Sequence, residues 1–422
     1  MRKAAILGST RIPFMKSMTK YLNIGNQELM TEVLKNLVHN YNLRDKRLGE
    51  VALGAVMKHS RDWNLARECT MGSGLSPDTP AYDIQQACGT SLEAAILVTN
   101  KIKLGQIDSA IAGGTDTNSD LPIVYGKDFT KLVLDSYRGR SGWEKAKPFF
   151  KLRPKHFIPV FPGVVEPRTR MSMGQSCEVM AKTWNVTREE QDQIAFESHQ
   201  KAAKAYEENF YLDLVTSFKG TNHDGIVRGD TAVEKLAKLR PAFDKKSGKG
   251  TLTAGNSTAL TDGAAAVLYG SEEWAEKNNL EVLAYFVDGE VSAVDFVNDE
   301  GLLMAPAYAV PRLLARNGLT LQDFDFYEIH EAFAAQLLCT LKAWESDEFC
   351  KEKLGLDKAL GSIDRNKLNV KGGSLALGHP FAATGARIVG TLAKTLKEKG
   401  SGRGLISVCT AGGMGVTAII ER

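Results

Sequence analysis

Two similar helix–strand units, one near each end of the chain, constrain the fold most strongly. In each, a predicted helix leads through a Gly-containing turn into a short apolar strand with a Gly-Gly exit. The helices span 91–104 and 384–399, and the strands that follow span 109–114 and 405–409. Helix–strand alternation implies crossover connections, so the pattern predicts an α/β protein with a largely parallel sheet. It also suggests two similar halves, although any two helix–strand units share these features.

The middle of the chain differs from both ends. It is rich in basic and aromatic residues, and five prolines fall between Pro148 and Pro167. This composition predicts an irregular insertion with its own helices rather than more sheet. One helix is well signalled, because Thr187 to Glu190 form a capping-box pattern that leads into a helix reaching Asn209.

Composition bounds the class of protein. The 422 residues are 43% hydrophobic and 24% charged, with a net charge of +3, so the chain is long enough for two or more domains and its bulk charge does not indicate nucleic-acid binding. The six cysteines include no CxxC pair, which disfavours structural zinc and fits free thiols in a reducing compartment. The first eight residues enter a probable strand without the features of a signal peptide, and no apolar run reaches about 20 residues. A cytoplasmic protein, or the mature form of an organelle protein, is expected.

Cys88 is the first candidate for chemistry. It lies in the segment 85–91, directly before the first predicted helix, between the small residues Ala87 and Gly89. The positive end of the helix dipole and free backbone N–H groups would lower the thiol pKa and favour the reactive thiolate. A buried structural cysteine is the commoner role, so the segment alone leaves the role open.

Cys409 is the second candidate. It lies at the end of an apolar strand, before a turn that contains Gly412 and Gly413. The carboxyl ends of parallel strands face the usual active-site crevice, and glycine permits close approach to a ligand. A core cysteine beside a turn is the alternative.

Two histidines complete the set. His379 lies in the Gly- and Pro-bounded segment 372–385 before the second helix, where an imidazole could take a thiol proton near neutral pH. His330 follows the strand-like segment 324–329 and could donate to an oxyanion. No second histidine stands at zinc-ligand spacing from it, and an ordinary helix start is the alternative.

The segment 253–264 is rich in glycine and hydroxyl residues. It could line a tunnel for a slender substrate arm, or simply pack two layers closely. The chain has no P-loop lysine and no clear GxGxxG after a strand, so nucleotide hydrolysis and NAD binding find little support.

Together these segments resemble the thiolase family. The matching motifs, in the family's order, are Ala-Cys-Gly-Thr-Ser around Cys88, His-Glu-Ala-Phe-Ala from His330, Gly-His-Pro around His379, and Cys-Thr-Ala-Gly-Gly-Met-Gly from Cys409. Similar segments run from Arg2 to Arg422. The resemblance implies an α/β fold of five layers, α-β-α-β-α, with two similar halves, mixed sheets and an inserted loop domain.

The resemblance also implies a division of the chain. The N-terminal half would comprise 1–118 and 250–272, with the nucleophile Cys88. The inserted loop domain, carrying CoA and partner contacts, would be 119–249. The C-terminal half would be 273–422.

Variant positions point to a subgroup. Many thiolases have Asn where His330 stands, whereas the thiolase (β) subunits of fatty-acid-oxidation trifunctional complexes have His. The segments 378–385, 239–243 and 256–263 also look like that subgroup. The resemblance therefore implies a 3-ketoacyl-CoA thiolase of β-oxidation. The alternatives are an acetoacetyl-CoA thiolase working in the condensing direction, a decarboxylating ketoacyl synthase of related fold, and a non-catalytic CoA-binding subunit.

The resemblance assigns roles by position. His379 would take the Cys88 proton, and the thiolate would attack the keto carbonyl in a ping-pong reaction. Cys409 would protonate the departing enolate, whose oxygen would meet His379 and a water held by His330. The tetrahedral oxyanion would meet the backbone N–H groups of Cys88 and Ala411, where many family members have Gly in place of Ala411.

Substrate contacts and partners are implied in the same way. The resemblance places CoA beside Arg228, Thr258, Met173, Leu239, Phe243, Ala254, Ala332 and Phe333, for whose apolar members core packing is the alternative. CoA is a substrate, and no cofactor or metal is expected. A homodimer or tetramer is expected, with a possible α-subunit that has hydratase and 3-hydroxyacyl-CoA dehydrogenase activities. The basic, aromatic stretch 143–157 could meet that subunit or a membrane surface, or be a solvated loop.

Overall fold

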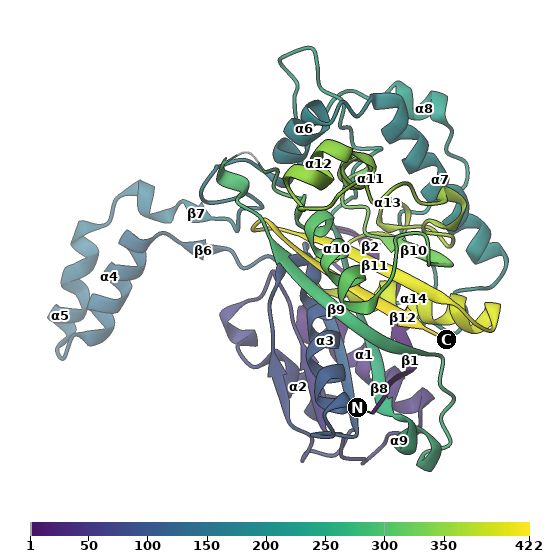
Figure 1. Cartoon of the computed structure of the whole chain (residues 1–422). Coiled ribbons are helices and arrows are strands. Elements are labelled where there is room, and N and C mark those ends of the chain that lie inside the picture. Colours follow the sequence, from purple (N-terminus) through teal and green to yellow (C-terminus); the bar gives the residue numbers. More distant parts are fainter. Residues whose placement is uncertain (1, 299) are drawn as a thin grey trace.

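The computed structural model describes residues 2–298 and 300–422. Its main feature is a mixed ten-stranded sheet (Figure 1). The strands are β1 (Ala4–Arg11), β2 (Met15–Lys16), β3 (Glu50–Leu53), β4 (Ala81–Asp83), β5 (Ser109–Asp116), β8 (Thr261–Ser271), β9 (Ala284–Ala293), β10 (Phe326–Ile329), β11 (Arg403–Thr410) and β12 (Met414–Glu421). A separate ribbon pairs β6 (Val124–Tyr125) with β7 (Pro159–Val160).

The two halves of the sheet repeat one strand order. In the N-terminal half it runs β4-β3-β5-β8-β1, and in the C-terminal half β10-β11-β12-β9. Leu368 bridges in parallel to Tyr327 of β10, at the place that β4 holds beside β3. The halves join where β1 pairs with β9. The predicted likeness of the two halves is confirmed.

The expectation of a largely parallel sheet is wrong. Only the β3–β4, β3–β5 and β10–β11 pairs are parallel among the described strands, and the others are antiparallel. One reason is the connection after the C-terminal helix–strand unit. The turn 411–413 returns the chain directly from β11 to β12, and so short a turn allows only an antiparallel neighbour.

Helices form the other layers. Two outer helices, α1 (Asn26–Asn40) and α2 (Leu65–Ser73), cover one side of the N-terminal half, and α10 (Ala305–Asn317) covers β9 and β12 on the C-terminal side. Between the halves, α3 (Thr90–Lys103) packs against α14 (Thr384–Lys399). Both central helices are buried on most faces, as a middle layer requires. The five-layered α/β architecture is therefore confirmed.

The remaining helices lie mainly in the insertion and around the C-terminal half. They are α4 (Lys127–Arg138), α5 (Gly142–Ala146), α6 (Met173–Thr183), α7 (Arg188–Glu207), α8 (Val233–Ala237), α9 (Glu272–Lys277), α11 (Ala334–Glu345), α12 (Asp347–Glu352) and α13 (Ser374–Leu377). No helix in the described part of the chain has the length and apolar character to cross a membrane.

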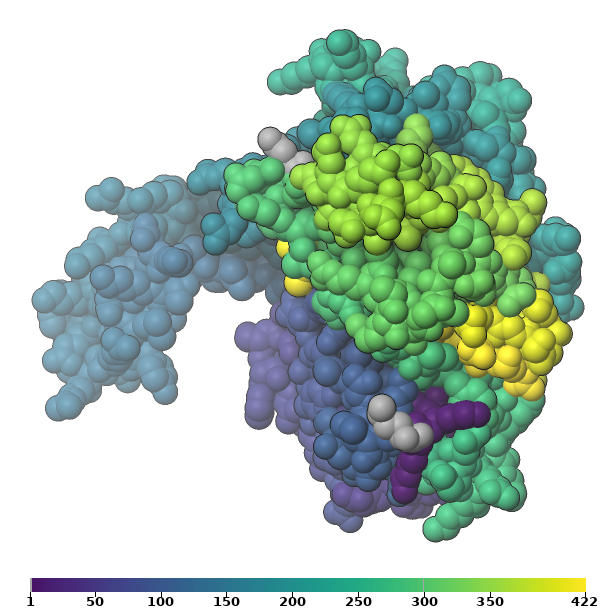
Figure 2. Space-filling view, viewed as in Figure 1, coloured from purple at the N-terminus to yellow at the C-terminus, as the bar shows by residue number. Residues whose placement is uncertain are grey.

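The insertion has two parts with different burial. Helices α6 and α7 pack against α11, and their apolar residues belong to the same core cluster as those of the C-terminal half. The predicted capping box at Thr187 is present, with its side chain accepting from the Glu190 N–H. Residues 123–165, by contrast, form an arm that projects from the body (Figures 1 and 2). Leu132 is the one buried residue in that arm.

Candidate active site

The site lies where the first turns of α3 and α14 meet. A Cβ atom on Gly385 would come within 2.6 Å of the Leu92 backbone nitrogen, so only glycine allows this approach of the two helices. Ser91 Oγ accepts from the Ala386 N–H at 2.8 Å, across the contact. The segments that precede the two helices are thereby brought together, and each carries one reactive side chain.

Cys88 and His379 are those two side chains. Cys88 lies in a single 3-10 turn, Ala87–Gly89, directly before α3, and His379 lies five residues before α14. The Cys88 sulfur is 3.0 Å from His379 Nε2. Ala87 has a φ of 44°, a strained conformation for a residue with a side chain and one often found where a functional group is held in place.

The thiol of Cys88 is held mainly in its protonated form. Burial of the thiol raises its pKa to about 12. The backbone N–H groups of Ala411 and of Cys88 itself act in the opposite direction but are the weaker effect. The expectation that the helix N-terminus would yield a low pKa is therefore wrong, because desolvation of the charged form outweighs the favourable backbone groups. Near neutral pH the site therefore holds the thiol and not the thiolate.

His379 presents a neutral imidazole to the Cys88 thiol. Burial, aided by the positive charge of Arg387, lowers the imidazole pKa to about 3. Nδ1 lies 2.6 Å from Thr384 Oγ1, and the backbone N–H donates to Thr261 Oγ1. When Nδ1–H donates to Thr384, Nε2 presents its lone pair to the Cys88 thiol.

Cys409 reaches the same site from β11. Its side chain is 1% exposed, and burial, followed by the charge of the neighbouring Cys88 thiolate, raises its pKa well above the usual range. The end of β11 packs against the turn that carries Cys88: a Cβ atom on Gly89 would lie 2.9 Å from Thr410 Cγ2. The two thiols therefore lie near each other, and both are neutral.

His330 forms the third side of the site. Its ring centroid is 4.1 Å from that of His379, and one ring nitrogen of each histidine lies with the Cys88 sulfur inside a 4.8 Å group. Asn369 fixes the backbone just before His330, because its side chain accepts from the Ile329 N–H and donates to the Ile329 carbonyl. Such a thiol and two imidazoles have the chemistry of a zinc ligand set, and the expectation that no metal is needed stays a prediction.

The backbone supplies two N–H donors at the nucleophile. The N–H groups of Cys88 and Ala411 lie close enough to the Cys88 sulfur to lower the pKa of its thiol. The loop that carries Ala411 is held from the insertion, since Glu166 Oε1 accepts from the Gly412 N–H at 2.7 Å. These donors lie where the resemblance expects an oxyanion.

The residues expected to contact CoA fall largely into one region. Phe243 and Phe333 stack edge to face with centroids 5.8 Å apart, Met173 packs on the same cluster, and the Thr258 N–H donates to the Ala332 carbonyl. Leu239 is partly exposed and lies beside Gly255, next to the exposed Ala254. Arg228 is exposed on a loop against α7.

One of these side chains has a contact that the sequence did not suggest. The Thr258 hydroxyl donates to the Ser374 carbonyl at 2.9 Å, so its hydrogen is already used and only its lone pairs are open to a ligand.

Several residues around the site were not anticipated. Asp116, at the end of β5, accepts from the backbone N–H groups of Val56, Met57 and Ala382 and so ties the His379 loop to the N-terminal half. Ser374 and Arg387 lie behind His330. For Asp116 the available signal was the Gly-Gly pair before it, which matches the pair after Cys409. The residues that Asp116 binds lie far from it in the chain, so the sequence could not show these contacts.

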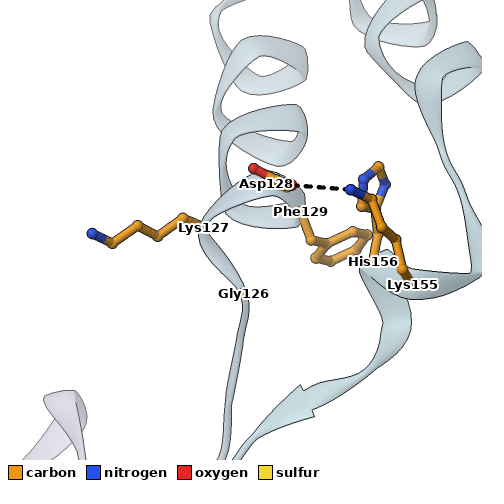
Figure 3. Close-up of a pocket in the computed structure, with 6 residues that line it drawn as sticks. All are labelled: Gly126, Lys127, Asp128, Phe129, Lys155 and His156. Atoms are coloured by element: carbon orange, nitrogen blue, oxygen red, sulfur yellow. Dashed lines mark ion pairs between the residues drawn. The ribbon is translucent and has the colours of Figure 1, made fainter.

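The projecting arm carries a separate, shallow pocket (Figure 3). It is lined by Gly126, Lys127, Asp128, Phe129, Lys155 and His156. Lys155 and Asp128 form an exposed ion pair of 3.7 Å across it. This pocket is remote from the thiols, and part of the stretch 143–157 forms one wall.

Comparisons with known proteins agree with this geometry. The thiolase N-terminal domain matches residues 4–273 and the thiolase C-terminal domain matches 280–422. A 3-ketoacyl-CoA thiolase from Yersinia pestis (strain Pestoides F) and one from Yersinia pseudotuberculosis (serotype O:1b, strain IP 31758) are each 40% identical, over 99% of this chain and 97% of theirs. The crystal structure of a Bacillus anthracis acetyl-CoA acetyltransferase is similar with a TM-score of 0.81 and 30% identity, covering 100% of this chain and 99% of that one. The chain therefore belongs to the thiolase family and is an acyltransferase.

Proposed function

We propose that the protein is a 3-ketoacyl-CoA thiolase of fatty-acid β-oxidation. It cleaves a 3-ketoacyl-CoA with CoA to acetyl-CoA and an acyl-CoA shortened by two carbons. The observation that carries the proposal is the 3.0 Å contact between the Cys88 sulfur and His379 Nε2, with the Cys409 thiol close enough for the charge of Cys88 to act on its pKa. The names of the relatives at 40% identity support the same substrate class.

The first half-reaction uses both thiols. His379 Nε2 takes the proton of Cys88 as the sulfur attacks the C3 carbonyl, and the oxyanion formed meets the N–H groups of Cys88 and Ala411. The C2–C3 bond then breaks, and the electron pair passes to the acetyl-CoA enolate. Cys409 donates a proton to the enolate carbon, and acetyl-CoA leaves. The enolate oxygen, while it lasts, is stabilised from the side of His330 and His379.

The second half-reaction releases the acyl group. Cys88 now holds it as a thioester, and Cys409 takes the proton of an incoming CoA thiol. The CoA sulfur attacks the thioester carbonyl, and Cys88 leaves as a thiolate that recovers its proton from the His379 imidazolium. Two neutral thiols and a neutral imidazole are restored. This scheme predicts ping-pong kinetics.

Trapping the intermediate tests the proposal. The protein is mixed with 3-ketoacyl-CoA in the absence of free CoA, quenched in acid and digested for mass spectrometry. An acyl group on Cys88 is the expected result, and the Cys88→Ala variant is the matched control. An enzyme that turns over without ever showing that adduct would contradict the scheme and favour a non-catalytic or differently catalysed protein.

The acetoacetyl-CoA thiolase is the second candidate. The structural neighbour named acetyl-CoA acetyltransferase favours it, because the two folds superpose over the whole chain. Thiolysis rates across a ladder of 3-ketoacyl-CoA chain lengths separate the two. We expect kcat/KM to be larger for long chains than for acetoacetyl-CoA, and a maximum at the four-carbon substrate would select the alternative.

The decarboxylating ketoacyl synthase is separated by Cys409. Full thiolysis by Cys409→Ala would favour that rival, whose chemistry needs one cysteine. The expected dimer or tetramer is checked by light scattering of the purified chain, and the cytoplasmic location by cell fractionation.

The arm 123–165 completes the proposal by docking on an anionic membrane surface. The arm contains nine Lys and Arg residues but only three acidic residues. Several of its large aromatic side chains are exposed, including Tyr137 at 84% and Phe150 at 74%. Basic residues beside exposed aromatic rings are typical of peripheral membrane contacts. Figure 2 shows that the arm stands clear of the body.

Vesicle flotation tests the arm. The wild type is expected to float with anionic vesicles at low salt and not with neutral ones, whereas Trp143→Ser/Phe150→Ser should stay behind with unchanged thiolysis. Equal flotation of both proteins would overturn the membrane proposal. A wild type that ignores vesicles but co-purifies with an α-subunit through the arm would assign the surface to that partner instead.

A further inference from the structure

His330 brings an unused ring nitrogen to the site. Nδ1 lies 2.9 Å from Ser374 Oγ, whereas Nε2 has no hydrogen-bond partner among the described residues although the ring is 1% exposed. A neutral imidazole carries one proton, on one nitrogen or the other. With the proton on Nε2, His330 can donate to a substrate oxyanion, and with it on Nδ1 the free nitrogen would repel that oxyanion. The tautomer therefore decides whether this residue helps.

The neighbours of Ser374 determine which tautomer forms. Arg387 Nη2 donates to Ser374 Oγ at 2.8 Å, and a guanidinium has no acceptor. One lone pair of the serine oxygen is thus occupied. Ser374 Oγ has two partners among the described residues, Arg387 and His330, so the His330 ring is the only one that can receive the serine hydrogen. The opposite arrangement, with Nδ1–H donating to the second lone pair, would leave the buried serine hydrogen without a partner, which costs free energy. Pairing that hydrogen therefore favours Nδ1 as the acceptor and places the ring proton on Nε2.

We propose that Arg387 and Ser374 are positioning residues that hold His330 as the Nε2–H tautomer, ready to donate to the substrate oxyanion. The inference rests on the proposed thiolase function for its kinetic part and on hydrogen bonding for the rest. It also sets the two histidines apart. His379 needs a lone pair on Nε2 to act as a base, and His330 needs a proton there to act as a donor. Thr384 accepts from Nδ1–H of His379, whereas Ser374 donates to the bare Nδ1 of His330. The two hydroxyls therefore stabilise opposite tautomers.

Arg387 is buried in this arrangement, and Glu328 offsets only part of the cost, because burial still lowers the pKa of the guanidinium. Its Nη1 is 3.7 Å from a Glu328 carboxylate oxygen, and both side chains are buried. Glu331 adds further negative charge nearby and is itself bonded to Ser198 and Asn369. Burial lowers the pKa of His330, and so do repulsion between the protonated forms of the two histidines and the positive charge of Arg387. The His330 ring therefore stays neutral and has a defined tautomer.

The direct test reads the tautomer itself. Solid-state ¹⁵N NMR of the full chain, labelled at histidine, distinguishes protonated from bare ring nitrogens, and the His330→Asn variant assigns the signal among seven histidines. We expect His330 to show a protonated Nε2 and a bare Nδ1 in the wild type. In Ser374→Ala the bare Nδ1 signal should be lost or divided. A protonated Nδ1 in the wild type, or an unchanged ring in Ser374→Ala, would overturn the inference.

Kinetics supply the second readout. Ser374→Ala should lower kcat by about 10- to 100-fold, as loss of an orienting partner commonly does, with little change in KM. In a His330→Asn background, where no tautomer exists, the same substitution should cost less than about twofold, which an unspecific structural effect would not reproduce. Ser407→Ala is the matched control. Ser407 is a buried serine whose hydroxyl has no partner among the described residues and whose backbone carbonyl accepts from the His330 N–H.

Failure of the inference and failure of the proposed function look different. A wild type in which His330 carries Nε2–H but which shows no thiolysis would refute the proposed function. It would leave the positioning of His330 by Arg387 and Ser374 intact. A thiolytically active wild type in which His330 carries Nδ1–H would refute the positioning role alone. The positioning role would also be refuted if the losses of kcat in Ser374→Ala and His330→Asn were fully additive in the double variant.

Discussion

The two halves of the molecule have one frame and different chemistry. Before the central helix, the N-terminal half carries the thiol Cys88 and the C-terminal half the imidazole His379. At the end of the strand that follows, Asp116 holds backbone N–H groups in one half, whereas Cys409 faces the nucleophile in the other.

A third pair of positions shows why the halves diverged. The residue after β3 is Gly54 and the residue after β10 is His330. A Cβ atom on Gly54 would lie 1.9 Å from the Ile84 carbonyl oxygen, so no side chain fits there. Of the four side chains at the proposed active site, three come from the C-terminal half. The N-terminal half contributes the proposed nucleophile, Cys88, and the carboxylate of Asp116, which anchors the His379 loop.

Removing the proposed nucleophile, which the N-terminal half supplies, should have the largest effect on thiolysis. Cys88→Ala should reduce thiolysis on the order of 10⁶-fold, the size of loss seen when a covalent nucleophile is removed from a hydrolase. The acyl adduct should vanish in mass spectrometry while the melting temperature stays near that of the wild type. Retained thiolysis would mean that the N-terminal half does not supply the nucleophile.

Cys409→Ala should come next. Loss of a general acid and base lowers the rate by about 10²- to 10⁴-fold. Because Cys88 and His379 remain, alkylation of Cys88 by an acyl-like reagent should persist, which separates the roles of the two thiols. Simultaneous loss of alkylation would show instead that Cys409 supports the nucleophile's half of the site.

Two substitutions at Ala411 distinguish the contribution of its backbone N–H group from that of its side chain. Ala411→Pro removes the N–H and should cost about 10²- to 10³-fold in kcat, the usual loss of one oxyanion-hole donor. Ala411→Gly keeps the N–H and should stay within about twofold of the wild type. Steady-state thiolysis of the pair, with thermal melts as folding control, checks this. Equal losses in both variants would point to the side chain.

Each of the four predicted site residues lies at or next to an element boundary that local residues define, which is why the sequence could single it out. The helices α3 and α14 begin within one residue of the predicted starts. The pKa of Cys88 was misjudged because burial is a tertiary property, and the dipole argument counts only local terms. Asp116 was missed because the Ala382 N–H that it accepts lies 266 residues away.

The anchoring carboxylate should give a smaller effect. Asp116→Asn places an amide donor against one of three N–H groups, which should destabilise the fold by about 1–3 kcal/mol and lower kcat about tenfold. Asp262→Asn is the matched control, because that carboxylate also accepts N–H bonds, from Asn118 and Ser119, but among the described residues it makes no hydrogen bond to the His379 loop. The control should lose stability and keep kcat, and an equal loss of kcat in both would deny the anchoring role.

The pH dependence should show the smallest effect of all. Burial raises the Cys88 thiol pKa to about 12 and lowers the His379 imidazole pKa to about 3, so the pair holds a single shared proton between those limits. The log of kcat/KM should therefore show no acid limb from His379 and no alkaline limb from Cys88 between about pH 5 and 9. Thiolate absorbance, taken as wild type minus Cys88→Ser, should be absent at pH 7 and appear only as the pH approaches 12. A thiolate signal at pH 7 would mean that the halves meet as an ion pair, with the dipole of α3 outweighing burial after all.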